Sequence, residues 1–599
     1  MNQWKYILFL VIASVLVFFR VCGHDFLIYD DAVNVYYNPF VVNFSPGNLL
    51  YFWLGTYKNL FIPLTYNLWS VQAKISQILS PAHGTLLDPR IFHTTNLLFH
   101  LANAVLVFSL LRGLLKDSLA ATLGALFWAV HPVQTEAVAW VSGFKDLLSG
   151  FFSLLALRFF LAYGQTASRG WPFRHRWYLL ATLFFVCALL SKPSAVMVPL
   201  LAAVIAFWLL DRQPRQLGRD LLPWLLLTLP VVVGTKMSQP DDLYPYMMLP
   251  SLWQRFLIAG DTLSFYLYKL AFPLRLCTDY GRSPEYVLGH GWVYGTGLLP
   301  YALLGLLLWR GRKREALAAV GLFAAWLLPV LGFVTFIHQY YSTPADRYLY
   351  LALLGPAYGL GWFLARRREP WPRLACAGLL LLLGLKTVAQ TGVWKNPETL
   401  NRHILTVNPA SPIGHNNLAI VLRHQGRNPE AQAYLERLIR IAPEYHMAYF
   451  NMGKIMEDLA MPEEAMDYYG KVLDLMPTYG EAHYARGRLL MDAANWQQAL
   501  ASLEEAVRLK PSFAESRVNL GIVLVRLNRL PEAENQFRIA LRIDPTDPGA
   551  YNGLGVALIR LGRKTEAQAA FEAAVRLAPG YGEARENLER IRSMEATEE

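Results

Sequence analysis

Residues 512–545 read SFAESRVNLGIVLVRLNRLPEAENQFRIALRIDP and form one unit of a pattern that repeats along the last third of the chain. The unit is 34 residues long (545 − 511 = 34), and the prolines in phase with its end are Pro409, Pro443, Pro477, Pro511, Pro545 and Pro579. Small residues recur in phase at Ala419, Gly453, Gly487, Gly521 and Gly555, and again at Ala431, Ala465, Ala499, Ala533 and Ala567. A fixed period of this length indicates stacked pairs of helices.

The unit resembles the tetratricopeptide repeat, in which small residues stand where two helices cross and proline follows the second helix. Five full repeats are predicted from about Pro412 to Gly580, with a polar capping helix over Glu583–Ser593. We therefore expect a tetratricopeptide α-solenoid over residues 412–599. Residues 394–411, with a partial helix at Asn396–Leu405, are expected to connect it to the preceding part of the chain.

Long runs of Leu, Phe, Val and Ala dominate residues 1–393 and predict an integral membrane domain. The first run, Tyr6–Val21, lacks a small-residue cleavage site, so we interpret it as a retained helix and not as a signal peptide. About eleven spans are expected in total. The other ten lie near residues 91–111, 119–129, 138–163, 177–190, 195–210, 221–235, 292–309, 316–337, 348–365 and 374–391.

The formal net charge is +11, and the Lys and Arg residues cluster between the apolar runs. This distribution predicts that the positive charge faces an anionic membrane surface and not nucleic acid. The basic clusters predicted to be cytoplasmic are Arg112 with Lys116, and residues 169–176, 212–219, 310–314 and 366–373. Leu252–Phe272, which carries charged residues, is predicted to be re-entrant or interfacial within an outer segment 252–291. The N-terminus is then cytoplasmic and the repeats are periplasmic, in a bacterial inner membrane.

The first outer loop, residues 23–90, contains FLIYDDAVNVYYNP at Phe26–Pro39. Its adjacent carboxylates, Asp30 and Asp31, indicate proton or sugar chemistry or a cation site, and the alternative is a solvated turn or a helix cap. An aromatic amphipathic stretch follows at Leu49–Ile78, with Trp53, Tyr57, Tyr66 and Trp69, and is expected to lie along the membrane interface.

Other ionisable residues fall at the predicted outer ends of the spans. They are His131, Glu136, Lys145, Asp146, Lys192, His338, Asp346 and Arg347. Because ionisable groups beside membrane spans are costly, a cluster of both signs indicates a charged or polar substrate. The alternative for any one of them is anchoring or capping of a helix end.

Four motifs carry a family resemblance: YDDAVNVYYNP at 29–39, HPVQTEAVAWVSGFKDLL at 131–148, SKPSAVMVPL at 191–200 and ADRYLYL at 345–351. With the repeats, they resemble the transmembrane and tetratricopeptide repeat-containing family, whose eukaryotic members are O-mannosyltransferases of the GT-C class. The resemblance implies an all-α, GT-C-type membrane domain joined to the repeat solenoid. It also implies transfer of a sugar from a polyprenyl-phosphate donor to a protein hydroxyl on the outer side.

This chemistry implies a role for each outer residue. Asp31 or Asp30 would be the general base of an inverting displacement, with Asp31 preferred. Arg347 would bind the donor phosphate because its planar fork contacts two oxygens, with Lys192 and Lys145 as the next candidates. The residues expected to orient the sugar or the acceptor are His131, Glu136 and His338. A monophosphate leaving group needs a metal less, because Arg and Lys can neutralise it, but the two aspartates with these three residues leave a Mg²⁺ or Mn²⁺ site open.

Asn417, Asn451 and Asn519 share one phase of the repeats and resemble the asparagine ladder with which protein O-GlcNAc transferase grips peptides. They are predicted to bind the protein or peptide acceptor, with helix packing as the alternative. Two other functions remain open at this point. One is transfer to a lipid or glycan acceptor, and the other is a membrane-anchored scaffold or transporter without catalysis.

Overall fold

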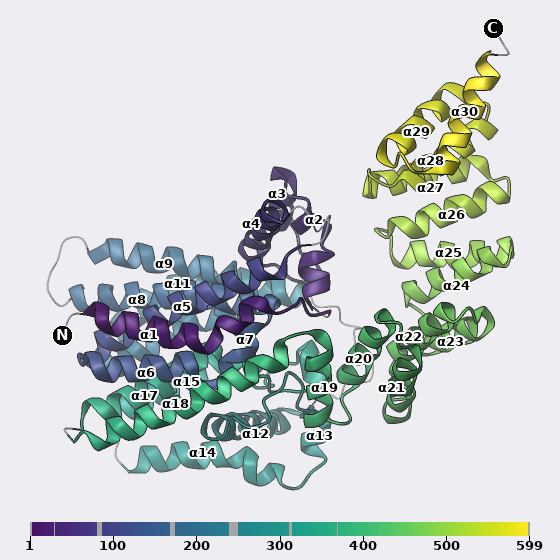
Figure 1. The fold of residues 1–599 in the computed structure, drawn as a ribbon. Coiled ribbons are helices and arrows are strands. Elements are labelled where there is room, and N and C mark those ends of the chain that lie inside the picture. The colour runs from purple at the N-terminus through teal and green to yellow at the C-terminus, as the bar shows by residue number, and fades with distance from the viewer. Residues whose placement is uncertain are drawn as a thin grey trace. The chain divides into compact units, whose positions relative to one another are not determined.

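The computed structural model describes residues 3–28, 30–80, 87–167, 174–238, 250–310, 314–367 and 369–596. Within these ranges the chain is helical, and the only extended pairing is an isolated bridge between Tyr57 and Leu60 (Figure 1). The predicted all-α class is therefore confirmed. The chain divides into two compact units, Met1–Leu418 and Ala419–Glu599.

The first unit holds the apolar helices together with two shorter helices near its end. Its α-helices up to residue 238 are α1 Gln3–Phe18, α2 Pro39–Val42, α3 Pro46–Leu54, α4 Pro63–Leu79, α5 Pro89–Leu115, α6 Ser118–Val130, α7 Thr135–Ala139, α8 Phe144–Ala167, α9 Arg174–Leu189, α10 Val198–Val204 and α11 Pro214–Ser238. Those that follow are α12 Leu252–Ala271, α13 Pro284–Leu288, α14 Val293–Trp309, α15 Arg314–Leu327, α16 Leu349–Ala352, α17 Leu354–Ala365, α18 Trp371–Thr391 and α19 Pro397–Val407. The division between the units falls inside α20, Pro412–His424.

Within the part of the chain that the structure describes, five helical segments are long and apolar enough to cross a membrane, or six if a pair bent by 47° is one span, so the first unit is a multi-pass membrane domain. They are Gln3–Gly23, Pro89–Leu115, Val141–Thr166, Pro214–Ser238 and Trp371–Trp394, with the bent pair Asp346–Ala352 and Leu354–Ala365. Shorter apolar helices among the described residues lie at Ser118–Val130, His175–Leu189, Pro193–Leu209 and Val293–Trp309. The expected count of about eleven stays a prediction.

The predicted apolar segment 316–337 is helical only as far as Leu327. Pro329 follows two residues later, and a proline has no backbone N–H to continue the helix. The chain from there to Arg347 contains only short helical turns, including Ile337–Tyr340 and Asp346–Tyr348. This interruption lets polar residues approach the end of the helix bundle.

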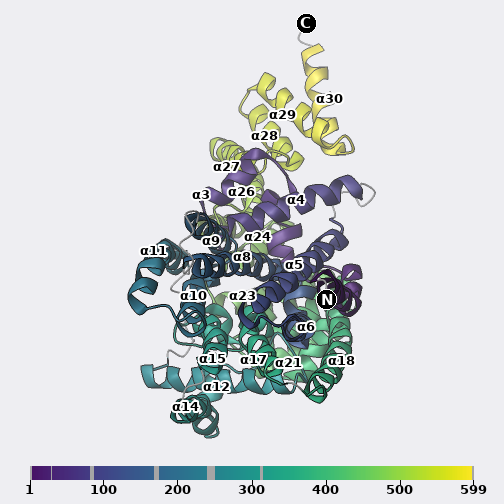
Figure 2. The same cartoon turned by 90° about the vertical axis from the view of Figure 1, so that its left-hand side faces the viewer.

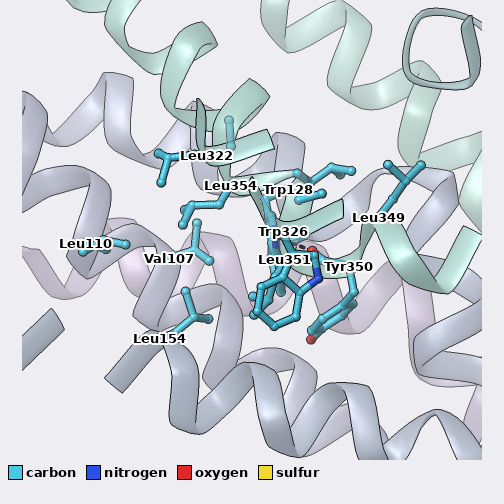
Figure 3. Packing of buried hydrophobic residues seen from close by; sticks show 14 of the residues in the cluster. Val107, Leu110, Trp128, Leu154, Leu322, Trp326, Leu349, Tyr350, Leu351 and Leu354 are labelled. Atoms are coloured by element: carbon cyan, nitrogen blue, oxygen red, sulfur yellow. Dashed lines mark hydrogen bonds between the residues drawn. The ribbon is translucent and has the colours of Figure 1, made fainter. Parts of the chain in front are cut away.

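The core of the first unit fixes the segment that follows Arg347. Tyr350 is fully buried against Trp128, whose indole Nε1 donates to the Tyr350 carbonyl oxygen at 2.9 Å (Figure 3). The Tyr350 hydroxyl accepts from Asn103 Nδ2 at 2.9 Å and lies 3.1 Å from His100 Nδ1. Since α5, α6 and the 346–354 segment meet at one aromatic cluster, the backbone at Arg347 is held rigidly.

The helix α12 packs along α14, and the two lie side by side in both views (Figure 1, Figure 2). Gly260 allows this close approach, because a Cβ there would lie 1.8 Å from the Gly297 carbonyl oxygen. The charges of α12 are satisfied inside the protein: Arg282 Nη2 donates to both carboxylate oxygens of Asp261 at 2.7 Å. The re-entrant or interfacial placement of α12 stays a prediction.

The aromatic stretch predicted at 49–78 forms two helices, α3 and α4. Trp53 is 41% exposed, but Tyr66 and Trp69 are buried. They pack with Phe52 and Phe144 in a small core of their own. The interfacial placement of the stretch stays a prediction, while these two side chains face the protein interior: Tyr66 stacks on Phe52 of α3, and Trp69 packs on Phe144 of α8.

Ion pairs join several of the predicted cytoplasmic loops at one end of the first unit. Arg373 Nη2 lies 3.5 Å from Asp117 Oδ2, and Arg314 Nη1 lies 2.5 Å from Asp211 Oδ1. These contacts agree with the expectation that the loops share one side of the membrane. The parts of the basic loops at 169–173, 311–313 and 368 lie outside the described residues.

The second unit continues the helix pairs predicted from the 34-residue period. Its helices are α21 Asn428–Ile441, α22 His446–Asp458, α23 Pro462–Leu475, α24 Gly480–Asp492, α25 Trp496–Leu509, α26 Ala514–Arg526, α27 Leu530–Ile543, α28 Pro548–Arg560, α29 Lys564–Leu577 and α30 Gly582–Ala596. The phased glycines face large side chains of the next helix: a Cβ at Gly521 would lie 2.7 Å from the Phe537 ring. This crossing explains why the period requires small residues.

Candidate functional site

A cavity of about 360 Å³ in the first unit gathers five of the predicted site residues. They are Asp30, Lys145, His338, Arg347 and Asn417. They come from the loop after α1, the first turn of α8, the interrupted segment before α16, and α20. Positions far apart in the sequence therefore meet at one place, as the predicted outer cluster requires.

Asp30 and Lys145 form an ion pair in this cavity. Lys145 Nζ lies 3.4 Å from Asp30 Oδ2, and the Asp30 side chain is 30% exposed while that of Lys145 is 15% exposed. The ammonium also lies 5.6 Å from the ring centroid of Trp140. Asp30 is thus a carboxylate that a ligand can reach, with a cation beside it.

Asp31 has a different environment and does not line the cavity. It is fully buried: Oδ2 accepts from the Leu27 N–H at 2.9 Å, and Oδ1 accepts from the N–H and the hydroxyl of Ser142 at 2.9 and 2.6 Å. Burial raises the pKa of Asp31 to about 7, although these hydrogen bonds act in the opposite direction. Asp31 ties the acidic loop to the turn before α8 and so places Asp30.

Arg347 is anchored by a carboxylate beneath it. Its Nη1 donates to Glu136 Oε1 at 2.5 Å, and its Nη2 donates to the Tyr348 hydroxyl at 3.3 Å. The guanidinium lies 5.8 Å from the Trp140 ring centroid. Since a guanidinium has five N–H groups and these contacts use two, donors remain for an anion in the cavity.

Lys192 lies near this group without lining the cavity. Its ammonium pairs with the Asp146 carboxylate, which is 7% exposed. Burial lowers the pKa of Lys192, Asp146 opposes the shift, and the charges of Lys145 and Arg347 lower it further. Lys192 therefore adds to the positive field, while its direct partner is a protein carboxylate.

The two histidines have separate environments. His131 is buried and caps the turn at Pro132–Gln134 by accepting from the Val133 N–H at 3.3 Å, so the capping alternative describes its position. His338 lines the cavity, and burial, aided by the charge of Arg347, lowers its pKa well below the usual value. Within the described ranges, His338 Nε2 and Trp140 Nε1 are buried without a hydrogen-bond partner. Both polar atoms belong to residues that line the cavity.

Of the five side chains considered for a divalent cation, Asp30 and His338 line the same cavity, and Asp31, His131 and Glu136 do not. Among the described residues, no group of three or more His, Cys, Asp or Glu side chains is arranged to hold a metal ion.

The predicted asparagine ladder is divided between the units. Asn417 lines the cavity, whereas Asn451 and Asn519 belong to the second unit. Asn451 is only 8% exposed, and Asn519 Nδ2 donates to the Tyr484 hydroxyl at 3.4 Å. Their role in acceptor binding stays a prediction.

Several cavity residues were not singled out from the sequence, namely Lys58, Trp140, Asp279, Trp394 and Asn401. Trp140 lies inside the HPVQTEAVAWVSGFKDLL motif, so its place there could have indicated it. Asp279 Oδ2 accepts from the Ser411 hydroxyl at 2.5 Å, a contact over 132 positions that no local pattern signals.

Comparison with known proteins identifies two similarities. Two family models, both described as tetratricopeptide repeat, match this chain: one matches residues 412–478, and the other matches residues 484–548 and 524–582. The solved structure of YrrB, described as a TPR protein with an unusual peptide-binding site, is 24% identical, with a TM-score of 0.28, and the match covers 31% of this chain and 96% of that one.

The curated relatives are protein O-mannosyl-transferases. TMTC1 of Homo sapiens is 27% identical over 430 residues, which cover 61% of this chain and 47% of that protein. TMTC4 of Mus musculus is 26% identical over 488 residues, which cover 70% and 64%. Tmtc3 of Drosophila melanogaster is 25% identical over 434 residues, which cover 59% and 46%. The match spans about half to two thirds of the length of these relatives.

Proposed function

We propose that this chain is a membrane glycosyltransferase that moves a sugar, mannose in the first instance, from a polyprenyl-phosphate donor to a hydroxyl of a protein acceptor. The observation that carries the proposal is the meeting of Asp30, Lys145, His338 and Arg347 in one cavity. An accessible carboxylate supplies a base, and two cations supply a phosphate site. The similarity to protein O-mannosyl-transferases supports the reaction class.

In the proposed reaction, the acceptor hydroxyl oxygen attacks the anomeric carbon of the donor sugar. The bond from that carbon to the phosphate oxygen breaks, its electron pair stays on the phosphate, and the configuration at carbon inverts. Asp30 takes the hydroxyl proton. Arg347 and Lys145 neutralise the charge that develops on the leaving polyprenyl phosphate, so the cavity stabilises the transition state electrostatically.

The geometry favours Asp30 over Asp31 as the base. The Asp31 oxygens already accept three hydrogen bonds from Leu27 and Ser142, whereas Asp30 faces the cavity. We assign Asp31 to positioning of the acidic loop. Asp30 then acts beside Lys145, whose ammonium lies 3.4 Å from Asp30 Oδ2.

The donor's isoprenoid tail needs an apolar surface next to the phosphate site. An apolar cavity of about 540 Å³ is lined by α12, α14, α15 and the residues that follow α15. The chain from its Phe333 continues within four residues to Ile337 of the polar cavity. This supports a lipid-linked donor and assigns its tail to the α12–α14–α15 surface.

The acceptor side is assigned to Asn417, to the neighbouring residues of α19 and α20, and to the repeats, with the cavity on the periplasmic side of a bacterial inner membrane. The experiment incubates the full-length chain in proteoliposomes with synthetic polyprenyl-phosphate mannose and Ser- or Thr-containing peptides. The proposal expects a peptide mass increase of one hexose. Transfer to a lipid or glycan alone replaces the acceptor class, and a donor that stays intact with every acceptor overturns the proposal.

A further inference from the structure

A second and larger cavity, of about 1030 Å³, lies at the other end of the first unit's helices. Its walls come from the end of α5, the start of α6, the last turns of α8, and the starts of α9 and α11. On α8, Lys145 lines the polar cavity while Arg158 lines this one. Thirteen residues of helix (158 − 145 = 13) separate them, or about 20 Å. The two cavities are therefore separate sites.

The charges around this second cavity are almost all of one sign. Five cationic residues line it and no described lining residue is a carboxylate; the five are Arg112, Lys116, Arg158, Arg212 and Arg219. Two carboxylates flank the lining residues. Asp220 lies 3.9 Å from both Arg212 Nη1 and Arg219 Nε and can offset only one of them. Asp117, next to Lys116 in the chain, is paired with Arg373 at 3.5 Å. Over the described ranges, Arg112, Lys116 and Arg158 have no carboxylate partner.

Arg158 is the least expected of these residues, because it belongs to the apolar segment Val141–Thr166. Its Nε donates to the Ser109 hydroxyl of α5 at 3.0 Å, which fixes the guanidinium at the cavity wall. A cation in a membrane-spanning helix is costly and is found where a partner or a ligand compensates it. The hydroxyl contact compensates only one of its N–H groups.

Arg212 is fixed in a similar way on the other side of the cavity. Its Nη2 donates to the Gly164 carbonyl oxygen at 3.1 Å, and its guanidinium lies 5.6 Å from the Tyr163 ring centroid. Trp177, which stacks on Phe159, contributes an aromatic surface. Fixed arginines beside hydroxyl and amide side chains are suited to several phosphate oxygens at once.

We infer that this basic cavity is a binding site for a phosphate-bearing anion, separate from the transfer site. Anionic phospholipid headgroups have this chemistry and lie at the depth where membrane helices end, and basic pockets between such helices bind them. A soluble phosphate compound has the same chemistry without the acyl chains. The volume of the cavity accommodates a headgroup with two phosphates.

The test measures binding and not transfer. The full-length chain in neutral detergent is titrated with phosphatidylglycerol or cardiolipin, with phosphatidylcholine, and in a separate arm with inorganic pyrophosphate, and native mass spectrometry counts the bound molecules. Arg158→Gln and Arg212→Gln are each expected to weaken anion binding about tenfold, the effect of one lost charge-assisted contact. A third variant, Lys116→Gln, changes an exposed lining residue, and folding tolerates it more readily.

The matched control is Arg215→Gln, which removes an exposed cation of α11 that does not line the cavity. Preference for anionic lipid that falls in the cavity variants and not in the control assigns the site to a headgroup. Pyrophosphate binding with the same pattern, without lipid preference, assigns it to a soluble anion. Equal binding of phosphatidylcholine and anionic lipid with no pyrophosphate bound, or cavity variants that bind like the control, overturns the inference.

Discussion

The Glu136 carboxylate accepts hydrogen bonds from both the guanidinium and the backbone N–H of Arg347. The guanidinium Nη1 lies 2.5 Å from Glu136 Oε1, and the Arg347 backbone N–H donates to Oε2 at 3.0 Å. The carboxylate is 1% exposed, so the pair is buried. Because both contacts come from the protein itself, they orient Arg347 toward the cavity, which favours electrostatic catalysis.

Arg347→Lys keeps the positive charge and removes the planar guanidinium, which can donate to two oxygens at once. We expect donor KM to rise and transfer to fall by about tenfold or more, because one ammonium cannot contact Glu136 and two phosphate oxygens together. Steady-state kinetics with varied donor measures this. Unchanged kinetics would remove Arg347 from the phosphate site.

Arg347→Ala tests the structural half of the pair. It leaves Glu136 as an unpaired buried charge, so we expect a loss of about 3–5 kcal/mol in the free energy of unfolding. Adding Glu136→Gln should restore most of the stability and none of the transfer. Equal stabilities of the single and double variants would contradict the buried pairing.

Asp31 should make stability depend on pH. The ordinary pKa of an aspartate is 3.8 and burial raises that of Asp31 to about 7, so the folded chain retains a proton that the unfolded chain releases. Its contribution is fully present below about pH 4 and is lost as the pH rises to about 7, by roughly 4 kcal/mol in total. Thermal unfolding from about pH 5 to pH 8 should show this loss.

The control for that experiment is Asp31→Asn, which cannot titrate. The difference in the free energy of unfolding between the wild type and this variant should fall across the pH window and become flat above it. The contributions of other titrating groups cancel in this difference. Ser142→Ala removes the hydroxyl that donates to Asp31 Oδ1 and keeps only the backbone N–H of residue 142 as a donor to that oxygen. Because the lost hydrogen bond favoured the ionised carboxylate, the upper end of the pH window should move to higher pH. A pH-independent difference would show that Asp31 is ionised throughout.

Gly521→Ala should loosen one repeat. The new Cβ would lie 2.7 Å from the Phe537 ring, and overpacking of this kind costs about 1–3 kcal/mol. Hydrogen exchange of α26 and α27 in the full-length chain measures the effect. Gly470→Ala is the matched control, since nothing lies within 4 Å of its Cβ and alanine favours a helix by about 1 kcal/mol. Similar exchange in both variants would contradict the packing role of Gly521.

The repeats were predictable from the sequence because each unit contacts mainly its neighbours. The same helix crossing therefore recurs in every unit, and it requires a small residue at Gly521 and at the equivalent positions. The apolar runs likewise predicted helices. The end of α15 at Leu327 was missed because the segment 316–337 is apolar throughout, and the prediction of a helix followed that composition and not the single proline after Leu327. The burial of Tyr66 and Trp69 was missed because it depends on packing against Phe52 of α3 and Phe144 of α8, which a local amphipathic pattern does not report.

For the site, the sequence predicted candidate residues, and five of them line one cavity: the ionisable Asp30, Lys145, His338 and Arg347, and the amide Asn417. The sequence could not distinguish the environments of Asp30 and Asp31. Asp31 is buried and bonded to Ser142, which lies 111 positions away in the chain. Pairings such as Lys192 with Asp146 likewise depend on how the helix ends pack. Residue type and spacing indicate chemistry, whereas the partner of each charge is a tertiary property.

Asp30→Asn in the reconstituted transfer assay tests the central claim most directly. Removing the base should lower the rate of mannose transfer from polyprenyl phosphate by about a hundredfold or more, with the chain folded and the donor still bound. Asp211→Asn, which changes an exposed aspartate outside the cavity, should transfer at the wild-type rate. A full transfer rate in the folded Asp30→Asn chain would contradict the assignment of this cavity as the catalytic site.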